Sequence, residues 1–235
     1  QSEVIAWATA LKEIAEKLKR AATGSVAVIA SARQTNEELY LARKLAQRFN
    51  ALTDSVPRTA EGDKLLLSRD RNPNSVGAKL TGIAPNEPGA RLPKIAGGIR
   101  GGQIKTLVVL GEDVTKHGIG AQLLGQLDTL IVSDLLPNAT TALAHYLLPG
   151  CAPAEKRGSF TNGKGRVQKF MKAVEPRGEA RAEWEFLHDL VFNVTGQDGF
   201  VSIEGLFNQM AREVEGFHEL TWAGLGDTGV TGSIA

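Results

Sequence analysis

Ile104-Lys-Thr-Leu-Val-Val-Leu110 is an almost continuous apolar run with the length and Val/Leu content of a strand buried on both faces. Three similar short runs occur at Val26–Ala30, Thr129–Val132 and Tyr146–Leu148, and helix-like segments separate the four. Strands that alternate with helices and are apolar on both faces indicate a parallel sheet covered by helices, and the right-handed crossover rule makes the sheet doubly wound. The sequence therefore predicts an α/β fold with a mainly parallel sheet and helices on both faces.

The helices are expected from apolar residues at helical spacing and from capping signals. Apolar residues recur at helical spacing over residues 4–18 and predict a helix that stops before Gly24. Thr35 and Glu38 have the spacing of a capping box, which opens a second helix that ends near Phe49. Further helices are predicted over residues 119–127, 138–144, 181–193 and 203–214.

The segment from about Asn50 to Arg91 is rich in proline, glycine, asparagine and charge. It predicts a long loop with a short helix over residues 74–82. Loops of this length are uncommon in compact domains, so we expect a functional or contact role for it. The paired glycines at 97–98 and 101–102 come just before a predicted strand, and we interpret them as loop glycines.

Composition limits the classes of function. With 235 residues, 42% of them hydrophobic, the chain can bury a large core. We predict an α/β domain over residues 1–175 and a helical extension over 176–235 packed on it. A net charge of +1 does not indicate a nucleic-acid or anionic-membrane partner. Cys151 is the only cysteine, which excludes a disulfide framework and any cysteine cluster with zinc or iron–sulfur spacing.

The cellular setting is expected from the same composition. The single cysteine agrees with a reducing cytoplasmic compartment. No apolar run has the length of a membrane span and no signal-peptide pattern is present, so we expect no membrane insertion. The chain begins with Gln1 instead of methionine and enters a helix almost at once, which favours a fragment of a longer polypeptide.

Polar residues follow three of the predicted strands. Ligands of an open parallel sheet bind outside the carboxyl ends of its strands. Those ends carry Ser31-Ala-Arg33, Gly111-Glu-Asp113 and Ser133-Asp134. The charged residue that ends each of these sequences is a candidate for contact with a ligand.

Gly158 to Lys164 spells G-x-x-x-x-G-K, most of a phosphate-binding P-loop. Gly165 follows the lysine, where a P-loop has the serine or threonine that holds magnesium. The residues before Gly158 form a turn-prone charged run instead of a strand, and those after Gly165 open a helix poorly. A nucleotide-binding protein that uses this loop stays an alternative, which a measurement of ATP affinity would decide.

Other enzymatic motifs are incomplete. Gly118-Ile-Gly120 begins a dinucleotide fingerprint, but Leu123 stands where the third glycine belongs, and we interpret the pair as a turn that opens a helix. The four histidines are scattered and no G-x-S-x-G sequence is present, so hydrolase chemistry has no support. Lys156 and Arg157 could lower the pKa of Cys151, but nothing else marks that thiol as a nucleophile, and we interpret it as a bystander.

Ala154-Glu-Lys-Arg-Gly-Ser-Phe-Thr-Asn-Gly-Lys-Gly-Arg-Val-Gln168 resembles the A-E-x-x-G-[ST]-x-x-N-x-x-G-R-x-Q signature of the molybdopterin oxidoreductase superfamily. The resemblance continues in order across nearly the whole chain. Thr35-Asn-Glu-Glu-Leu-Tyr40 is similar to a T-N-E-E-x-Y segment, Lys105–Asp113 to a K-x-L-x-V-L-G-E-[DN] strand, and Pro176–Arg181 with Trp184 to a P-x-G-E-A-R-x-x-W closing helix. On these motifs the chain is identified as a member of the superfamily.

Two departures from the active members bear on function. These enzymes hold molybdenum or tungsten between two pterin dinucleotides, usually with a cysteine, selenocysteine or serine ligand. The corresponding stretch here, Asn50–Pro57, contains no cysteine, and we interpret Ser55 as turn-forming. The chain also lacks the bulk of the inserted domain and the C-terminal pterin-binding domain of the catalytic enzymes.

Asp70-Arg-Asn-Pro-Asn-Ser-Val-Gly-Ala78 resembles a loop of the G subunit of bacterial NADH-quinone oxidoreductase, respiratory complex I. That resemblance implies a structural domain of a complex that passes electrons from NADH to quinone. It implies no catalytic residue, metal ligand or cofactor in this chain, and [2Fe-2S] and [4Fe-4S] clusters elsewhere in the parent chain. The implied partners are the iron–sulfur domain of the same subunit and other peripheral-arm subunits, in the cytoplasm and peripheral to the inner membrane.

The resemblance leaves an enzyme as the alternative, the core of a molybdenum- and pterin-dependent oxidoreductase of the formate dehydrogenase or nitrate reductase type. Its cofactor would be molybdopterin guanine dinucleotide, whose pyrophosphate calls for helix N-termini, glycine backbone and several cations. Arg166 could equally be a structural residue bonded to backbone carbonyls or to Glu155, and we favour that role. The residues that would line the pterin cavity are Arg33, Asp113, Asp134, Asn162 and Arg166.

Overall fold

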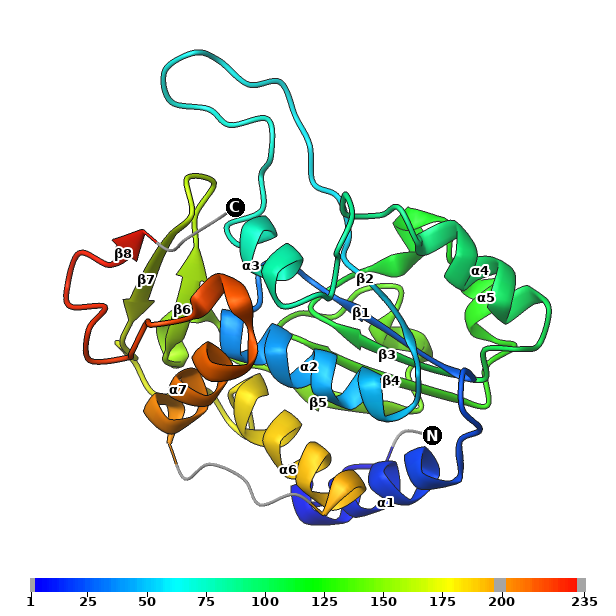
Figure 1. The fold of residues 1–235 in the computed structure, drawn as a ribbon. Coiled ribbons are helices and arrows are strands. Elements are labelled where there is room, and N and C mark those ends of the chain that lie inside the picture. Colours follow the sequence, from blue (N-terminus) through cyan, green and yellow to red (C-terminus); the bar gives the residue numbers. More distant parts are fainter. Residues whose placement is uncertain (1–2, 197–201, 232–235) are drawn as a thin grey trace.

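The computed structural model of the protein describes residues 3–196 and 202–231, so the expectation drawn from Gln1 lies outside the described residues. Its centre is a five-stranded sheet in the order β2-β1-β3-β4-β5, in which every neighbouring pair is parallel (Figure 1). The four strands that the apolar runs predict are confirmed, and a short strand, β2, extends the sheet beyond β1. In chain order the strands are β1 Val26–Ala30, β2 Leu52–Asp54, β3 Thr106–Leu110, β4 Thr129–Asp134 and β5 Tyr146–Pro149.

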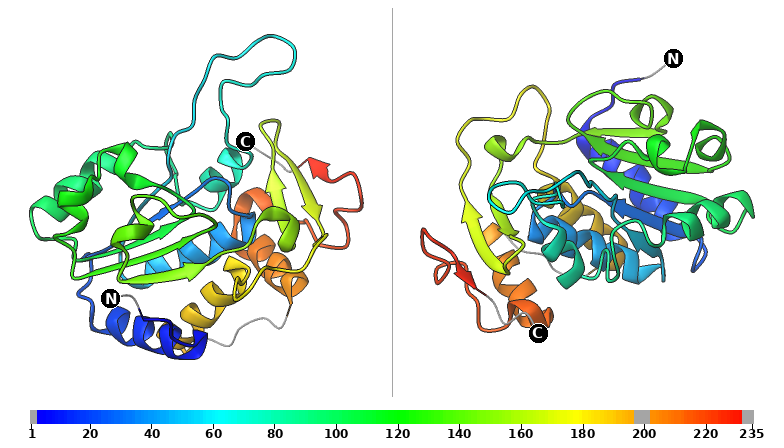
Figure 2. Two further views of the ribbon diagram at one scale, coloured as in Figure 1. Left: turned by 180° about the vertical axis from the view of Figure 1, so that it is seen from behind. Right: turned by 90° about the horizontal axis from the view of Figure 1, so that it is seen from above.

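Alternate residues of β1, β3 and β4 face two separate hydrophobic clusters, one on either side of the sheet. Val28 and Val108 belong to a cluster that also contains residues of α1, α2, α6 and α7. Ile29 and Val109 belong to the other cluster, together with residues of α4 and α5 (Figure 2). The doubly wound α/β fold is confirmed. The bounds of these helices are α1 Trp7–Arg20, α2 Asn36–Arg48, α4 Leu92–Arg100, α5 Ala121–Leu124, α6 Glu183–Thr195 and α7 Ile203–Glu213.

The capping box at the start of α2 is confirmed. Thr35 Oγ1 accepts a hydrogen bond from the backbone N–H of Glu38 at 3.2 Å, and the Glu38 carboxylate accepts one from the backbone N–H of Thr35 at 2.8 Å. Two backbone donors that a helix N-terminus leaves unpaired are thereby satisfied. Both residues are fully buried, which is unusual for a helix start and places charge inside the protein.

A small antiparallel sheet, in the order β6-β7-β8, lies beside the N-terminus of α2. Its strands are β6 Gly158–Thr161, β7 Arg166–Phe170 and β8 Val230–Thr231. The stretch that carries the family signature therefore forms a hairpin, which periodicity did not predict. Its alternation of polar and apolar residues is short and is interrupted by the glycine-rich turn.

Three local predictions need correction. Gly97 and Gly98 are helical residues of α4 instead of loop residues. A Cβ on Gly98 would lie 2.7 Å from Ile104 Cδ1, so glycine at this position lets the helix pack closely against Ile104. The helix predicted over 119–127 is reduced to α5, and the one over 138–144 to a single 3-10 turn, Thr141–Leu143. The short helix within the long loop is confirmed as α3 Ser75–Leu80.

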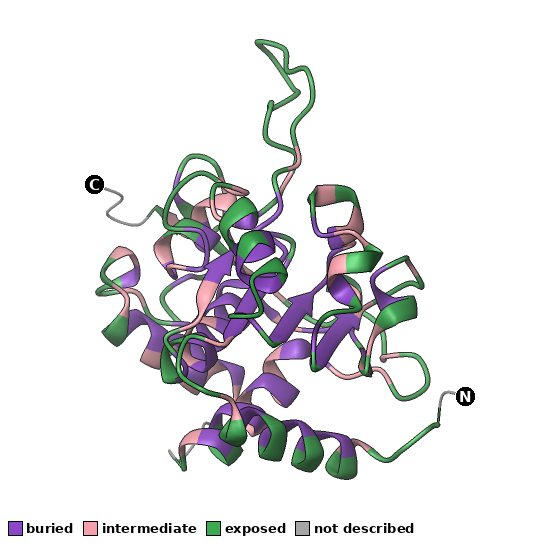
Figure 3. Cartoon of the chain, turned by 90° about the vertical axis from the view of Figure 1, so that its right-hand side faces the viewer, coloured by how far each residue is buried: buried purple, intermediate pink, exposed green. Residues whose placement is uncertain are grey.

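The C-terminal helices share the main hydrophobic cluster with the sheet. Helix α6 packs against α1 and α2, and its Phe186 and Leu187 are buried in the same hydrophobic cluster as residues of those helices. The strands of the central sheet are mostly buried (Figure 3). The division into a domain over 1–175 and an extension over 176–235 stays a prediction, and residues 1–2, 197–201 and 232–235 of those ranges lie outside the described residues. Across the part of the chain that is described, no helix is both long enough and apolar enough to cross a membrane.

Residues 58–71 form an arm that projects from the body of the protein near the end of β2 (Figure 1). The two sides of the arm meet in an antiparallel bridge between Thr59 and Asp70. The arm occupies the middle of the segment predicted as a long loop.

Candidate functional site

The polar residues after β1 and β3 meet at the centre of the carboxyl edge of the sheet. In this strand order the winding direction reverses between β1 and β3, the position at which doubly wound sheets bind ligands. The Arg33 guanidinium donates to the carbonyl oxygen of Gly111 and, through Nε, to Ser31 Oγ at 3.2 Å. Gly111 has a φ of 71°, and a Cβ there would lie 2.9 Å from Gln34 Nε2, so the backbone at this position needs glycine.

A buried carboxylate, Glu112, lies between two arginines at this edge. Arg58 Nη2 donates to Glu112 Oε2 over 2.6 Å, and Arg33 Nη2 lies 4.0 Å from the same oxygen. The Glu112 side chain is fully buried, whereas those of Arg58 and Arg33 are 36% and 48% exposed. Within the described residues, Glu112 Oε1 and Arg58 Nε have no hydrogen-bond partner. Both arginines therefore neutralise an internal anion.

The loop after β4 joins the other two acidic candidates. Asp113 Oδ1 accepts hydrogen bonds from Thr115 Oγ1 at 2.6 Å and from Thr140 Oγ1 at 2.9 Å. Asn138 Nδ2 donates to Asp134 Oδ2 over 2.8 Å, and the Thr140 N–H donates to Asn138 Oδ1 over 2.9 Å. Burial raises the pKa of Asp113, but the hydrogen bonds from Thr115 and Thr140 outweigh it and hold the pKa at about 2. We call Arg33, Arg58, Glu112, Asp113 and Asp134 the strand-end edge.

The remaining two candidates lie in the β6–β7 hairpin. Asn162 Oδ1 accepts from the backbone N–H groups of Lys164 at 2.9 Å and Arg166 at 3.0 Å, and so shapes the turn. Arg166 Nη1 donates to the carbonyls of Thr228 at 3.0 Å and Gly229 at 3.3 Å, which agrees with the favoured structural role. No hydrogen bond or ion pair of the described residues joins this pair to the strand-end edge. The structure thus groups three of the five candidates and separates two.

The P-loop-like sequence Gly158–Lys164 covers strand β6 and the hairpin turn, so it does not connect a strand to a helix. A Cβ on Gly158 would lie 2.4 Å from Thr35 Cγ2, and the missing side chain lets β6 pack on the start of α2. Gly163, by contrast, has nothing within 4 Å of a built Cβ. The first glycine of the motif therefore serves packing.

The start of α2, the hairpin and α6 meet in a second polar region that sequence reasoning did not identify as a site. We call it the buried junction. Seven of its eight residues are 0–2% exposed, and Lys156 is 4% exposed. A signal was available, since three polar residues directly after a capping threonine match the T-N-E-E segment. Its members are Asn36, Glu37, Glu38, Asn74, Lys156, Ser159, Thr161 and Glu183.

One half of the buried junction is a hydrogen-bond network between α2 and β6. Glu37 accepts from the backbone N–H of Ser159 at 2.9 Å and from its Oγ at 2.7 Å. Asn36 Nδ2 donates to Ser159 Oγ over 3.0 Å, and Asn74 Oδ1 accepts from the Thr161 N–H at 2.8 Å. Burial raises the pKa of Glu37 to about 7, although the bonds from Ser159 lower it.

The other half is a buried ion cluster. Lys156 Nζ lies 2.8 Å from Glu38 Oε1 and 2.7 Å from Glu183 Oε2. Burial lowers the pKa of Lys156, but the charges of Glu38 and Glu183 outweigh it and raise the pKa, so the lysine is charged. Burial also raises the pKa of Glu183 to about 7 against the opposing effect of Lys156. One cation thus holds two carboxylates at the starts of two helices.

Cys151 is next to this cluster and 2% exposed. Burial and the charge of Glu183 raise its pKa to about 12. Lys156 lowers the pKa of Cys151, as the sequence suggests, but burial and Glu183 outweigh it. The cations have other partners: Lys156 holds Glu38 and Glu183, and Arg157 forms an ion pair with Glu204. The interpretation of Cys151 as a bystander thiol agrees with this environment.

The described part of the structure has two surface grooves. The first groove, of about 520 Å³, is lined by prolines and apolar residues near α4, together with Arg100 and His117. The other, of about 480 Å³, lies near the amino ends of the strands. None of the five candidate residues lines either groove. The described residues include no group of three or more His, Cys, Asp or Glu side chains that could hold a metal ion.

Comparison with known proteins decides the family. The family model described as molybdopterin oxidoreductase matches residues 68–192, more than half of the chain. The chain belongs to the molybdopterin oxidoreductase family. The matched part contains β3, β4, β5, the hairpin and most of α6.

Curated relatives of this molybdopterin oxidoreductase domain come from several kinds of protein. NADPH-Fe(3+) oxidoreductase subunit alpha of Geobacter sulfurreducens is 36% identical over 151 residues, 63% of this chain and 17% of the relative. F420-dependent formate dehydrogenase 1 subunit alpha of Methanococcus maripaludis is 35% identical over 55% of this chain and 20% of the relative. The G 2 subunit of NADH-quinone oxidoreductase of Rhizobium meliloti is 31% identical over 69% of this chain and 19% of the relative. The chain thus spans about a fifth of the length of these relatives.

The family name implies a molybdopterin cofactor, and the strand-end edge is where a parallel sheet would receive it. A dinucleotide pyrophosphate needs cationic side chains that are not already paired with another anion. Here Arg58 is paired with Glu112, Arg33 lies 4.0 Å from the same carboxylate, and the ionised carboxylate of Asp113 adds negative charge to the same edge. Ser55, in the stretch that by resemblance corresponds to the metal-ligand loop, is fully buried. As arranged, these residues do not fit a pterin dinucleotide.

Proposed function

We propose that this chain is the molybdopterin-oxidoreductase-like domain of the G subunit of an NADH-quinone oxidoreductase, with a structural role. The observation that supports it most is that the buried Glu112 carboxylate forms an ion pair with Arg58 and lies 4.0 Å from Arg33, so the cations of the strand-end edge already face an internal anion. The absence of cysteine from Asn50–Pro57 points the same way, because the family's metal has no thiolate ligand there. The similarity to the G 2 subunit of Rhizobium meliloti, over 69% of this chain, agrees with the assignment.

In this role the domain contributes no catalytic residue, metal ligand or cofactor. The parent protein takes part in electron transfer from NADH to quinone through [2Fe-2S] and [4Fe-4S] clusters that other segments hold. Its partners are the iron–sulfur domain of the same subunit and neighbouring subunits of the peripheral arm. The assembly is cytoplasmic and associated with the inner membrane through other chains.

Elemental analysis of the full-length parent protein, purified natively from cells grown with added molybdate and tungstate, tests the proposal. We expect several iron atoms per chain and neither molybdenum nor tungsten above a few per cent of stoichiometry. A known molybdoenzyme purified from the same cells controls for metal supply. Stoichiometric molybdenum or tungsten in the parent protein would overturn the structural role.

A pterin-dependent oxidoreductase is the second candidate, because the Fe(3+) oxidoreductase and formate dehydrogenase alpha subunits share 36% and 35% identity with the chain, more than the 31% of the G 2 subunit. In that case the cavity would be lined by Arg33, Asp113, Asp134, Asn162 and Arg166. Metal content again discriminates. An Arg33→Ala variant should lose bound molybdenum if the second candidate holds, and should change no metal content under the structural role.

A further inference from the structure

The face of β5 that points away from α1 is open to solvent. Tyr146 and Leu148 face the cluster that contains α1 and α6, and the Tyr146 hydroxyl donates to Glu13 of α1 over 2.9 Å. Side chains alternate between the two faces of a strand, so Leu147 points to the opposite side of the sheet. It is 54% exposed, whereas Val132, its neighbour in register on β4, is fully buried. The cover of this face therefore ends at β4, and β5 lies at the edge of the sheet (Figure 1).

The connection from β4 to β5, residues 135–145, is described throughout and contains no α-helix. Connections between parallel strands usually carry a helix that covers the sheet. Here the connection has a single 3-10 turn, Thr141–Leu143, which lies beside β4. Ala144 packs on the cluster that contains α4 and α5, so the connection crosses that face of the sheet but leaves Leu147 uncovered.

The surface that stays open is apolar and carries no charge of its own. Leu135, Leu136 and Leu143 of the same connection are 47%, 73% and 39% exposed. No Asp, Glu, Lys or Arg occurs in the sequence from residue 135 to residue 154, although 23% of all residues are charged. Exposed apolar side chains that gather without charge mark an interaction site. We call these three leucines and Leu147 the uncharged surface.

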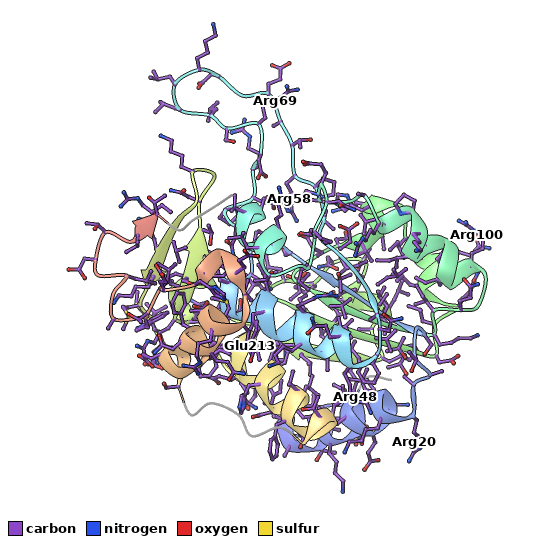
Figure 4. The ribbon with its side chains drawn as sticks, in the orientation of Figure 1. Arg20, Arg48, Arg58, Arg69, Arg100 and Glu213 are labelled. Atoms are coloured by element: carbon purple, nitrogen blue, oxygen red, sulfur yellow. The ribbon has the colours of Figure 1, made fainter. Side chains whose placement is uncertain are left out.

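The charged groups that border the uncharged surface offer no strong field of one sign. Asp134 accepts hydrogen bonds from the loop that follows it, and Lys116 forms an ion pair with Asp113 over 3.3 Å. Asp128 and His145, at the amino ends of β4 and β5, are exposed. Recognition at this surface therefore rests on apolar contact instead of charge. The arginines that Figure 4 labels lie on the arm and at the ends of α1, α2 and α4: Arg20, Arg48, Arg58, Arg69 and Arg100.

The connection that carries the leucines is held in one conformation. The Asn138 N–H donates to Thr141 Oγ1 over 2.7 Å, and Thr140 Oγ1 donates to Asp113 Oδ1 over 2.9 Å. The polar side chains of the connection thus bond within the protein, and the leucines are left on its outer side. A surface fixed in this way loses little conformational entropy when it is covered.

Two properties favour the same polypeptide as the source of the cover. A surface that must stay soluble until it meets a separate protein usually carries charge, which also speeds the encounter, whereas the core of a permanent interface is depleted of charged residues. The chain also spans only about a fifth of the length of its curated relatives. A parent protein of similar length therefore has enough further chain to complete the cover of the sheet.

We propose that a segment of the parent polypeptide outside residues 1–235 packs on the uncharged surface and covers β5, in the way that helices cover the rest of the sheet. The proposal rests on the proposed function only in that this chain is a domain of a longer protein, which both candidate functions share. Metal content, which decides between those candidates, has no bearing on it. The covering face is expected to be apolar, with aliphatic or aromatic side chains opposite the leucines.

Photo-crosslinking within the full-length parent protein tests the proposal. Benzoylphenylalanine at position 147, or at the more exposed position 136, should cross-link to a peptide outside residues 1–235 in a product of unchanged monomer mass. The same probe at Lys17, an exposed position of α1, is the control and should give no adduct to that peptide. An adduct to lipid, to another protein or to a second copy, an adduct confined to residues 1–235, or no adduct above the control would overturn the proposal.

Two double variants of the full-length protein separate covering from folding. Leu143→Ser/Leu147→Ser should raise amide hydrogen exchange in the cross-linked segment at least tenfold, because the apolar contact that protects it is lost. Met171→Ser/Val174→Ser changes two side chains of similar exposure, 56% and 54%, and should leave the exchange of that segment unchanged. Exchange in β3 should be the same in all three proteins, which shows that the sheet stays folded. Unchanged exchange of the segment in the leucine variant would refute the cover.

Discussion

The strand-end edge and the buried junction are both rich in charged side chains, but they differ in how far these side chains are buried and paired. In the junction, Lys156 is 4% exposed and two carboxylates share it at 2.7 and 2.8 Å. At the edge, one buried carboxylate is shared by two arginines that are 36% and 48% exposed, and Glu112 Oε1 has no partner within the described residues. The junction is a closed network that joins four segments: the start of α2, the residue before α3, the signature stretch and α6. The edge resembles a ligand site whose cations have acquired an internal counter-ion.

The difference agrees with an architectural role for the family signature. The signature hairpin contributes Lys156, Ser159 and Thr161 to the junction, where they hold the start of α2 and α6 in place. None of these contacts requires a bound cofactor.

The largest effect is expected from removing the cation of the junction. Lys156→Met leaves Glu38 and Glu183 buried without their partner, and breaking a buried ion pair in this way costs about 3–5 kcal/mol. Urea unfolding at pH 7 measures the loss. Lys164→Met, in the exposed hairpin turn, is the control and should stay within about 0.5 kcal/mol. A small loss at Lys156 would contradict the closed-network description.

The pH dependence of stability should single out Glu37. Its pKa is raised from 4.5 to about 7 by folding, so the folded state binds the proton more tightly than the unfolded state. The resulting stabilisation is complete below about pH 4.5 and is lost as pH rises through about 7, a change of at most about 3 kcal/mol. Glu37→Gln should flatten this decline in urea unfolding between pH 4.5 and 8.

Glu87→Gln, at an exposed position, is the control for that measurement and should keep the wild-type slope. Glu183→Gln should also flatten part of the decline, because the pKa of Glu183 is raised to about 7 as well. An unchanged slope in the Glu37→Gln variant would show that Glu37 is ionised in the folded protein at low pH.

The two glycines of the P-loop-like sequence should respond differently to alanine. Gly158→Ala places a Cβ 2.4 Å from Thr35 Cγ2 and should destabilise the chain by about 1–3 kcal/mol through overpacking. Gly163→Ala meets nothing within 4 Å and should be nearly neutral. Thermal unfolding distinguishes the pair. The phosphate-loop interpretation would be restored if both changes had equal effects, or if the unsubstituted chain bound ATP and these variants did not.

The smallest effect is expected at the strand-end edge. Arg58→Ala removes the closer partner of Glu112 but leaves Arg33, and both arginines are partly solvated, so the loss of stability should be about 1 kcal/mol. The arm should nevertheless loosen at its base, and trypsin should cleave after Lys64 and Arg69 several-fold faster. Arg100→Ala, remote from the arm base, should leave the cleavage rate unchanged. A loss as large as that of the Lys156 variant would mean that both regions are equally closed.

Sequence reasoning predicted the sheet because the signals for its long strands are local. Val26–Ala30 and Thr106–Leu110 are apolar on both faces, and the Thr35–Glu38 box starts a helix at its expected place. Strand β2 was not predicted because three residues carry too little periodicity. Helix α4 was not predicted because Gly98, which lowers helix propensity, is selected there for close packing against Ile104.

The site was predicted less completely than the fold. Arg33, Asp113 and Asp134 were correctly placed at the carboxyl edge, since parallel topology fixes where strand ends meet. Their partners were not predictable, because the pairing of Arg58 with Glu112 joins residues far apart in sequence. The junction escaped notice for the same reason. A glutamate at a helix start normally faces water, and only tertiary contacts bury Glu37 and Glu38.

The modification rate of the single thiol of the chain can report local opening of the buried junction. Cys151 is 2% exposed, its pKa is raised to about 12, and it borders the Lys156 cluster. A thiol-specific reagent at neutral pH should therefore modify the native protein only when this part of the core opens. The modification rate of each variant then reports how often its junction comes apart, without any added label or engineered probe.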